Sequence, residues 1–300
     1  MGVKADLGRI AFGAILAFRA LPAAELPMPP APAPATIEAR YAKSAVSIDG
    51  VLDDPVWANA PAHPLTLGSD RLVQDDAAAG EPVYGPPGIS AEADSLLDDE
   101  ILGLAGGVRL AVAQAPVTRQ TGVRERGDVR LAWDETCLYI AVVFEDSDIV
   151  AAGDADQMHH YRMGDVLEVF LWPDGQSGYW ELYATPHGRK TSFWHAEPTR
   201  VRSMADCAVR DCGLRVAARC QGTLNRRQDR DASWTAEMAI PFAELLPGAE
   251  AGAAPPRCRI LVARYNCGVT LPWTELSMVP RLSKTDFHLC GEYAVLKLVK

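Results

Sequence analysis

Residues 164–175, GDVLEVFLWPDG, alternate with the period of a β-strand, and the two faces of this strand differ in chemistry. The aliphatic residues of one face are Leu167, Val169 and Leu171. The residues of the other face are Glu168, Phe170 and Trp172. The aliphatic face is typical of a core-facing surface. A carboxylate placed among large rings is not typical of a solvated face, so we expect the Glu168 side to point outward and to have a function.

The next strand-like stretch, YWELYAT at 179–185, repeats this arrangement within a predicted hairpin over 166–185. Glu181 shares a face with Tyr179 and Tyr183, so Glu168 and Glu181 should meet among aromatic rings. Carboxylates accept hydrogen bonds from hydroxyl groups, and flat rings stack against apolar faces. The pattern predicts a sugar-binding surface. The alternative is an ordinary sheet face with scattered polar residues.

Strand-length runs separated by turn residues dominate the rest of the chain. The predicted strands are residues 45–48, 108–113, 129–133, 137–145, 166–172, 180–185, 214–221, 233–240, 259–266 and 293–298. Short helices are predicted at 54–60 and 241–246. Many short strands with few helices predict an all-β fold, an antiparallel β-sandwich of jelly-roll type.

The chain divides by composition into a leader, a linker and one domain. Residues 1–24 place Lys4 and Arg9 before a short apolar run and then small residues, which is the order found in a secretory signal peptide. Residues 25–40 are rich in Pro and Ala and predict a linker. Residues 41–300 form the predicted domain, with a loop insertion at about 74–107 where strand alternation is absent.

Composition excludes several classes of partner. The 300 residues are 48% hydrophobic and 23% charged, so the chain can bury a core. A net charge of −10 argues against binding nucleic acid or anionic lipid. No segment reaches the length of a transmembrane helix. With the leader, these observations predict an extracellular or periplasmic protein.

Common catalytic signatures are absent from the sequence, including the nucleophile elbow, the P-loop and the dinucleotide fingerprint. Asp165, Glu168 and Glu181 supply the paired carboxylates that a glycosidase needs, so hydrolysis stays an alternative. The seven cysteines are scattered without a C-x-x-C pair. A zinc site would need clustered thiol or His ligands, and the sequence predicts none.

Five separate blocks resemble carbohydrate-binding module family 9 in that family's order. The blocks are VSIDGVLDDPVWANA (46–60), DVRLAWDETCLYIAVVFEDSD (128–148), GDVLEVFLWPDG with GYWELYATPHG (164–188), SWTAEMAIPFAEL (233–245) and DFHLCGEYAVLKL (286–298). They cover most of residues 45–300 but not 74–107. The resemblance implies a β-sandwich that binds sugars, notably the reducing ends of glycans, without cleaving them, and structural calcium in some members.

The resemblance also implies roles for individual residues. Its sugar-binding members clamp a sugar between two Trp rings. Those positions correspond here to Arg162, with Tyr161 beside it, and to Phe287. The family's Glu corresponds to Glu168, and Glu181 replaces a sugar-contacting Arg. The clamp is therefore altered, which leaves the identity of the ligand open.

Three further groups of residues suggest binding. Arg264 alternates with Ile260 and Val262 on a later strand and is expected to hydrogen-bond sugar oxygens beside Glu168 and Glu181. Possible calcium ligands are Asp146, Asp148, Asp154 and Asp156, although a solvated acidic loop is the simpler interpretation. Residues 158–161, MHHY, contain haem-ligand residue types, although loop histidines are more often solvated.

We therefore expect a non-catalytic, exported carbohydrate-binding domain. Its ligand would be a mono- or oligosaccharide of an extracellular polysaccharide, and its partners would include glycoside hydrolases. The carbohydrate-binding residues would be Tyr161, Arg162, Asp165, Glu168, Glu181, Tyr183, Arg264 and Phe287. The alternatives are a haem-binding electron-transfer domain of the same fold and an accessory part of a glycoside hydrolase system.

The leader yields a first prediction. We expect residues 1 to about 24 to be removed on export, because a basic start, a short apolar run and small residues follow one another in that order. N-terminal sequencing of the protein purified from its native host measures this. Mature protein that retains Met1 or Gly2 would contradict the prediction.

Overall fold

The computed structural model describes residues 34–71, 122–197, 208–245 and 255–300. They belong to one compact unit, Pro34–Lys300. The predicted leader at 1–24 and the predicted insertion at 74–107 lie outside the described residues, as does the predicted strand at 108–113. In the described segments, no helix is long and apolar enough to cross a membrane.

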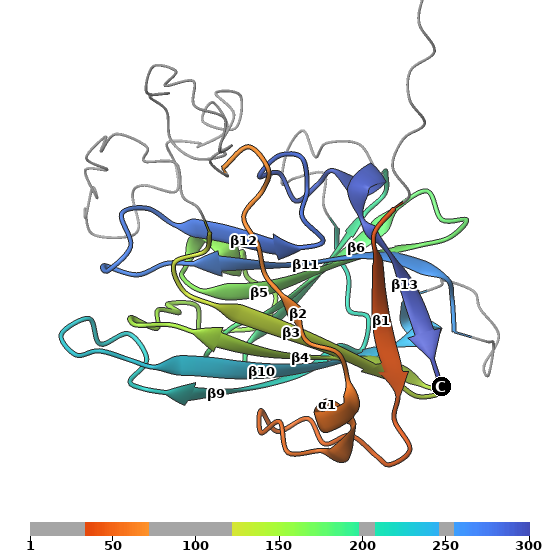
Figure 1. The fold of residues 1–300 in the computed structure, drawn as a ribbon, viewed down its shortest axis with the longest axis horizontal. Helices are drawn as coiled ribbons and strands as arrows, with labels where there is room; N and C mark the ends of the chain where they lie inside the picture. Colours follow the sequence, from red (N-terminus) through yellow and green to blue (C-terminus); the bar gives the residue numbers. More distant parts are fainter. Residues whose placement is uncertain (1–33, 72–121, 198–207, 246–254) are drawn as a thin grey trace, which may run out of the picture. The chain divides into compact units, whose positions relative to one another are not determined.

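The described residues form an all-β structure, which confirms the predicted class (Figure 1). The strands are β1 (Thr36–Tyr41), β2 (His63–Pro64), β3 (Gly127–Trp133), β4 (Cys137–Glu145), β5 (Val166–Pro173), β6 (Tyr179–Ala184), β7 (Lys190–His195), β8 (Ala208–Val209), β9 (Arg215–Gln221), β10 (Ser233–Pro241), β11 (Cys258–Asn266), β12 (Glu275–Val279) and β13 (Ala294–Val299). The two short α-helices, close to their predicted positions, are α1 (Pro55–Asn59) and α3 (Phe242–Leu245). Two 3₁₀ turns, η2 (His160–Arg162) and η4 (Cys290–Glu292), precede β5 and β13.

The strands join in one sheet with the order β8-β7-β6-β5-β11-β13-β1-β3-β4-β10-β9, while β12 pairs with β11 and β2 with β3. Most pairs are antiparallel, and β1 runs parallel to both β13 and β3. Figure 1 shows β1 in red beside β13 in blue. Residues 36–40 were predicted to belong to the linker, which is wrong, because Ile37 and Ala39 pack in the core and fix this segment as a strand.

The main core lies between two arms of this continuous sheet. Residues of β5, β6 and β11 and residues of β3, β4 and β10 belong to the same apolar cluster, which includes Val169, Leu182, Val262, Leu131, Ile140 and Trp234. The sheet therefore curls around its core as a sandwich does. The two layers are continuous with one another through β13 and β1.

The predicted strand at 45–48 is wrong, because the backbone there bonds to side chains instead of to another strand. The amide of Ser47 donates to Asp54 at 2.9 Å. Just beyond it, the amides of Asp49 and Gly50 donate to the buried carboxylate of Glu237 at 3.1 and 2.9 Å. Acidic side chains thus shape this segment into a loop that leads to α1.

Strand β5 is buried on both faces. Val169 and Leu171 are 0% exposed and face the main core, as predicted. Phe170 on the other face is 1% exposed, because it packs in a second apolar cluster with Phe287 and Tyr293 from the segment before β13. The expectation that this face points outward is wrong.

The aliphatic face of β5 yields a stability prediction. We expect Val169→Ala to lower the free energy of unfolding by about 2 kcal/mol, because it removes buried methyl groups and leaves a cavity. Val143 on β4 is 37% exposed, so Val143→Ala is a matched control that should change stability by less than about 0.5 kcal/mol. Chemical denaturation of the two variants measures this. Equal effects of both substitutions would contradict the assignment of Val169 to the core.

Candidate functional site

Glu168 on β5 and Glu181 on β6 lie on the same face of the sheet, as predicted. In the β5–β6 register, Glu168 pairs with Tyr183 and Glu181 pairs with Phe170. The two carboxylates are therefore diagonal neighbours, a relation that places Cβ atoms roughly 7–8 Å apart. Both are buried, at 2% and 4% exposure.

Glu181 is an ionised carboxylate held by two neighbours. The hydroxyl of Tyr183 donates to one of its oxygens, and Nε2 of His195 lies 2.5 Å from the other. Burial acts to raise the pKa of Glu181. The hydrogen bond to His195, together with the nearby His288 and His195 charges and the Tyr183 hydroxyl, outweighs burial and lowers that pKa below its ordinary value.

Glu168 is in the opposite state. Burial, reinforced by the negative charge of Glu181, raises the pKa of Glu168 well above its ordinary value. Its Oε1 atom is buried and has no hydrogen-bond partner in the part of the chain that the structure describes. An unsatisfied buried oxygen costs about 1–3 kcal/mol. Glu168 thus combines a raised pKa with a buried oxygen atom that is not hydrogen-bonded to any described residue.

A row of aromatic rings lies on the same face as these carboxyl groups. Tyr161 lies 6.0 Å from Tyr265, Tyr265 lies 5.7 Å from Phe287, and Phe287 lies 6.1 Å from Phe170, measured between ring centroids. We call this surface the Glu168 face and define it by Tyr161, Glu168, Phe170, Glu181, Tyr183, Phe193, Tyr265 and Phe287. It brings together five of the eight residues predicted to bind carbohydrate.

Arg162 lies at the rim of the Glu168 face. Its side chain is exposed, its Nε donates to the Tyr161 hydroxyl at 2.8 Å, and its guanidinium lies 5.3 Å from the centre of that ring. Tyr161 and Tyr265 are half-buried, while Phe287 is 5% exposed. Tyr161, Tyr265 and Arg162 therefore keep more accessible surface than Phe287 does.

Sequence reasoning missed two histidines beside Glu181. His195 ends β7, which was not predicted, and stacks on Tyr179 at 4.5 Å with an interplanar angle of 11°. His288 lies just before η4, and its Nδ1 is 2.7 Å from the Tyr179 hydroxyl. Among the described side chains, potential ligand atoms of Glu181, His195 and His288 lie within 4.8 Å of one another. The alternation that placed Tyr179 and Glu181 on one face was the available signal, but it could not locate their cross-strand partners.

The structure separates Arg264 and Asp165 from the Glu168 face, which corrects the expected grouping. Arg264 pairs with Leu167, so it lies on the core side of the sheet, where it is 1% exposed and bonds to Asp146 at 2.9 Å. Asp165 accepts hydrogen bonds from the amides of Val150 and Cys267 at 2.7 and 2.6 Å. Burial and the charge of Asp146 raise the pKa of Asp165 well above its ordinary value. Arg264 and Asp165 therefore hold buried segments in place through these bonds.

The acidic residues expected to bind calcium do not form one cluster in the described part of the chain. Asp146 and Asp148 are buried, and the Arg264 guanidinium already supplies a cation to Asp146. Asp154 and Asp156 are exposed in another loop, where Asp156 accepts a hydrogen bond from the Lys190 amide at 3.2 Å. Calcium binding stays a prediction.

The loop histidines are held by local contacts. The two ring nitrogens of His160 lie 2.8 Å from the Thr191 hydroxyl and 3.0 Å from the Ala155 carbonyl oxygen. His159 stacks on Phe193 at 5.2 Å. Haem ligation by His160 would require the hydrogen bond of the ligating ring nitrogen to break.

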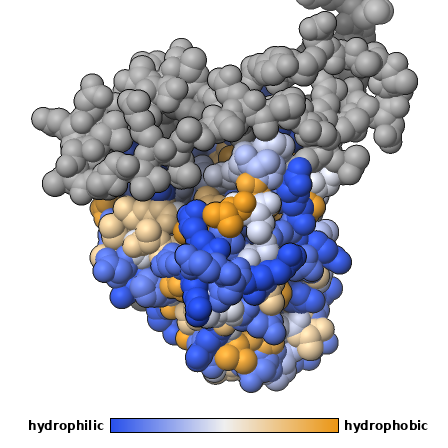
Figure 2. Space-filling view, turned by 90° about the vertical axis from the view of Figure 1, so that its left-hand side faces the viewer, coloured by the Kyte–Doolittle hydropathy of each residue, from blue (hydrophilic) through white to orange (hydrophobic). Residues whose placement is uncertain are grey.

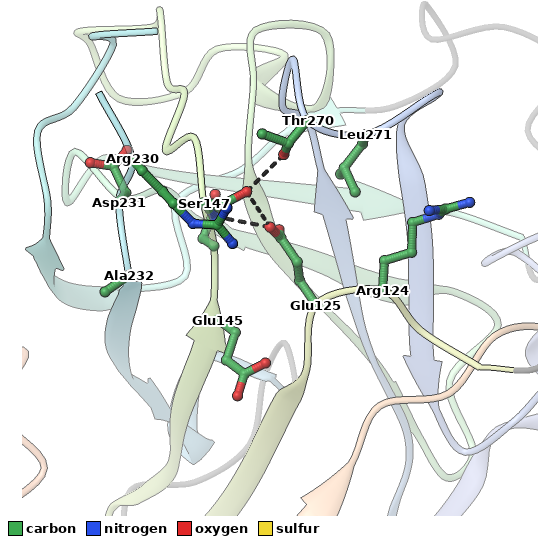
Figure 3. Close-up of a pocket in the computed structure, with 10 residues that line it drawn as sticks. Arg124, Glu125, Glu145, Ser147, Arg230, Asp231, Ala232, Thr270 and Leu271 are labelled. Carbon is green, nitrogen blue, oxygen red and sulfur yellow. Dashed lines mark hydrogen bonds between the residues drawn. The ribbon is translucent and has the colours of Figure 1, made fainter. Parts of the chain in front are cut away.

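A separate polar pocket of about 610 Å³ lies where the β3, β4 and β10 ends meet the β11–β12 connection. Figure 3 shows Ser147 bonded to Glu125 and to Thr270, at 2.6 and 2.7 Å between side-chain oxygens. The side of the molecule at the left of Figure 1, drawn in Figure 2, is mostly hydrophilic among its coloured residues. Through Ser147, this pocket's lining links the segment before β3, the segment after β4 and the β11–β12 connection.

No family model and no curated protein matches this sequence. Among solved structures, a "putative carbohydrate-binding protein" from Bacteroides uniformis ATCC 8492 has a TM-score of 0.58 at 12% identity, covering 89% of this chain and 100% of that one. Two structures of a family 9 carbohydrate-binding module from Caldicellulosiruptor kristjanssonii have lower scores. The complex with cellotriose has a TM-score of 0.43 at 12% identity, covering 88% and 93%. The complex with glucose has 0.45 at 10%, covering 87% and 95%. The match to the Bacteroides protein shows a shared fold.

The state of Glu168 predicts a pH dependence. Its folded pKa is raised, so its contribution to stability is fully present below its ordinary value of 4.5 and is lost as the pH rises through the folded value. Glu168→Gln keeps the side chain neutral, so we expect this variant to lose less stability than the wild type as the pH rises towards neutrality. Urea denaturation across this range measures the difference.

The matched control is Glu244→Gln, since Glu244 is exposed on α3. Its stability should follow the wild type at each pH. A Glu168→Gln variant that is equally pH-dependent would show that Glu168 ionises normally in the folded protein.

Proposed function

We propose that this chain is a non-catalytic carbohydrate-binding domain and that its ligand occupies the Glu168 face. The observation that carries the proposal is the buried, unpartnered oxygen of Glu168 beside the row of rings that runs from Tyr161 to Phe287. The shared fold with a protein described as carbohydrate-binding supports the same assignment.

The chemistry of the two carboxyl groups suits a sugar. A neutral Glu168 can donate one hydrogen bond and accept others, whereas an ionised Glu181 only accepts. Neighbouring sugar hydroxyls need both kinds of partner. A hydroxyl bound to Oε1 of Glu168 would also remove the cost of an unsatisfied buried acceptor.

The depth of the site favours a small ligand or the end of a glycan. Glu168 and Phe287 are almost fully buried, while Tyr161 and Arg162 keep accessible surface at the rim. A chain that passes through the site in both directions would need an open groove. A terminal sugar can enter from the Tyr161 side and leave the rest of the glycan in solvent.

Glycoside hydrolysis is the second candidate, and the divergent pKa values favour it. A carboxyl group with a raised pKa next to one with a lowered pKa is the arrangement of a general acid and a charged partner. However, Glu181 is bonded to Tyr183 and His195, which leaves it poorly placed to activate water.

The setting is also a proposal. The order of residues in the leader supports export, and the net charge of −10 suits a neutral ligand better than a polyanion. We propose an extracellular or periplasmic polysaccharide as the source of the ligand and glycoside hydrolases as the enzymes that act on the same polymer.

A glycan array on the full chain identifies the ligand, and titration calorimetry then tests Glu168. We expect Glu168→Ala to weaken binding of the best mono- or disaccharide by roughly tenfold or more, about 1.4 kcal/mol, because it removes a buried hydroxyl partner. Glu244→Ala, which removes an exposed carboxylate, should bind like the wild type.

The remaining outcomes separate the candidates. Unchanged affinity in Glu168→Ala would remove Glu168 from the binding site. Release of reducing sugar from the bound glycan by the wild type, and its loss in Glu168→Ala, would show an enzyme. Soret absorbance of the purified protein would support the haem-binding alternative.

A further inference from the structure

Glu181, His195 and His288 converge from three separate segments. Glu181 is on β6, His195 is at the end of β7, and His288 precedes η4. One potential ligand atom from each side chain lies within 4.8 Å of the other two. Around a tetrahedral ion with bonds of about 2.0–2.1 Å, ligand atoms are roughly 3.3 Å apart. Small side-chain movements would therefore close this group around an ion.

Tyr179 fixes the orientation of both histidines. Its ring stacks on His195 at 4.5 Å, and its hydroxyl lies 2.7 Å from Nδ1 of His288. Metal-bound histidines commonly bond through their second ring nitrogen to a neighbouring oxygen, which holds the ring in place. The contact between the Tyr179 hydroxyl and the His288 ring is of this kind.

The surroundings limit how far these side chains can move. Phe170 packs edge-on against His288 at 5.5 Å, and His195 is 3% exposed. Glu168 places a second carboxyl group on the same face. A positive ion would reduce the cost of burying two neighbouring acidic groups, since buried charges are usually paired or bound to metals.

We propose that Glu181, His195 and His288 form a binding site for a divalent transition-metal ion, with Zn²⁺ as the ion that fits best. Two imidazole nitrogens and one carboxylate oxygen are a ligand set used for zinc. Calcium and magnesium prefer oxygen ligands, which disfavours them here. Binding would replace the direct Glu181–His195 hydrogen bond with two bonds to the ion.

Three protein ligands leave at least one position on the ion for water or another ligand. The site goes beyond the proposed function, because a metal ion needs no sugar to bind there, but the two proposals share Glu181. Their tests remain distinguishable. The zinc test varies His195 and His288 in the absence of sugar, and the sugar test varies Glu168 in chelator-treated protein.

Calorimetric titration of the chelator-treated full chain with Zn²⁺ tests the site. We expect one ion per chain with a dissociation constant in the micromolar range or below. His195→Gln and His288→Gln should each weaken binding at least tenfold. His187→Gln is the matched control, because His187 is exposed in the turn between β6 and β7, at the other end of the hairpin from His195, and this variant should bind like the wild type.

X-ray absorption of the zinc-loaded wild type decides the ligand set without relying on folded variants. Two imidazoles with further oxygen or nitrogen ligands, and no sulfur, are expected. Sulfur ligation, the absence of a stoichiometric ion, or unchanged affinity in folded His195→Gln and His288→Gln variants would each overturn the proposal. Tighter binding of Fe²⁺ or Mn²⁺ than Zn²⁺ at the same residues would overturn the choice of ion.

Discussion

The burial of β5 on both faces is the constraint on which the rest of the structure depends. A strand with an aliphatic face needs one apolar layer, which the other arm of the sheet supplies. Its second face carries Glu168, and that face is covered as well. A carboxyl group taken out of water must be neutralised, paired or hydrogen-bonded. The groups around Glu168 must therefore offset the free-energy cost of taking its carboxyl group out of water.

The protein meets this constraint differently at two places. On the core side of the sheet, Asp146 is matched by the guanidinium of Arg264, and the pair lies against the Phe144 ring. On the other side, Glu181 has a histidine and a tyrosine, while one oxygen of Glu168 has no partner. The first arrangement pairs opposite charges, although Nε and Nη1 of Arg264 are buried without a hydrogen-bond partner among the described residues. The second leaves a buried acceptor beside a row of aromatic rings, and the proposed function places the ligand there.

The period of two predicted the faces of β5 and β6 correctly, because side-chain alternation is a local property of a strand. Whether a face meets solvent is not local. Phe287 and Tyr293 cover Phe170 from a segment more than a hundred residues away along the chain. The alternation of residue types in β5 does not indicate that these residues pack there. The same limit explains Arg264, whose alternation was recognised but whose side depends on the register between β11 and β5.

The histidines of the candidate metal site show why clusters are hard to recognise in β proteins. A helix places ligands at short, regular intervals, so a sequence motif reveals them. A sheet assembles them across strands, and the fold alone brings His195 opposite Tyr179. His288 joins them from a connection outside the sheet, where its Nδ1 lies 2.7 Å from the Tyr179 hydroxyl. Neither residue lies in a pattern that distinguishes it from an ordinary loop or edge histidine.

On the proposed function, the residues at the rim indicate that sugar recognition depends less on ring stacking and more on hydrogen bonds. Relatives of the kind that this sequence resembles clamp a sugar between two Trp rings, whereas the corresponding positions here hold Tyr161 with Arg162 and a nearly buried Phe287. With less exposed aromatic surface, a site here would stack less extensively against the faces of a sugar ring. On the proposed function, the buried carboxyl groups would then contribute more to recognition. A site built to hydrogen-bond a hydroxyl rejects ligands that lack it far more strongly than an apolar pocket rejects an extra group. On the proposed function, selectivity should therefore follow the positions of the sugar hydroxyls more than the length of the glycan.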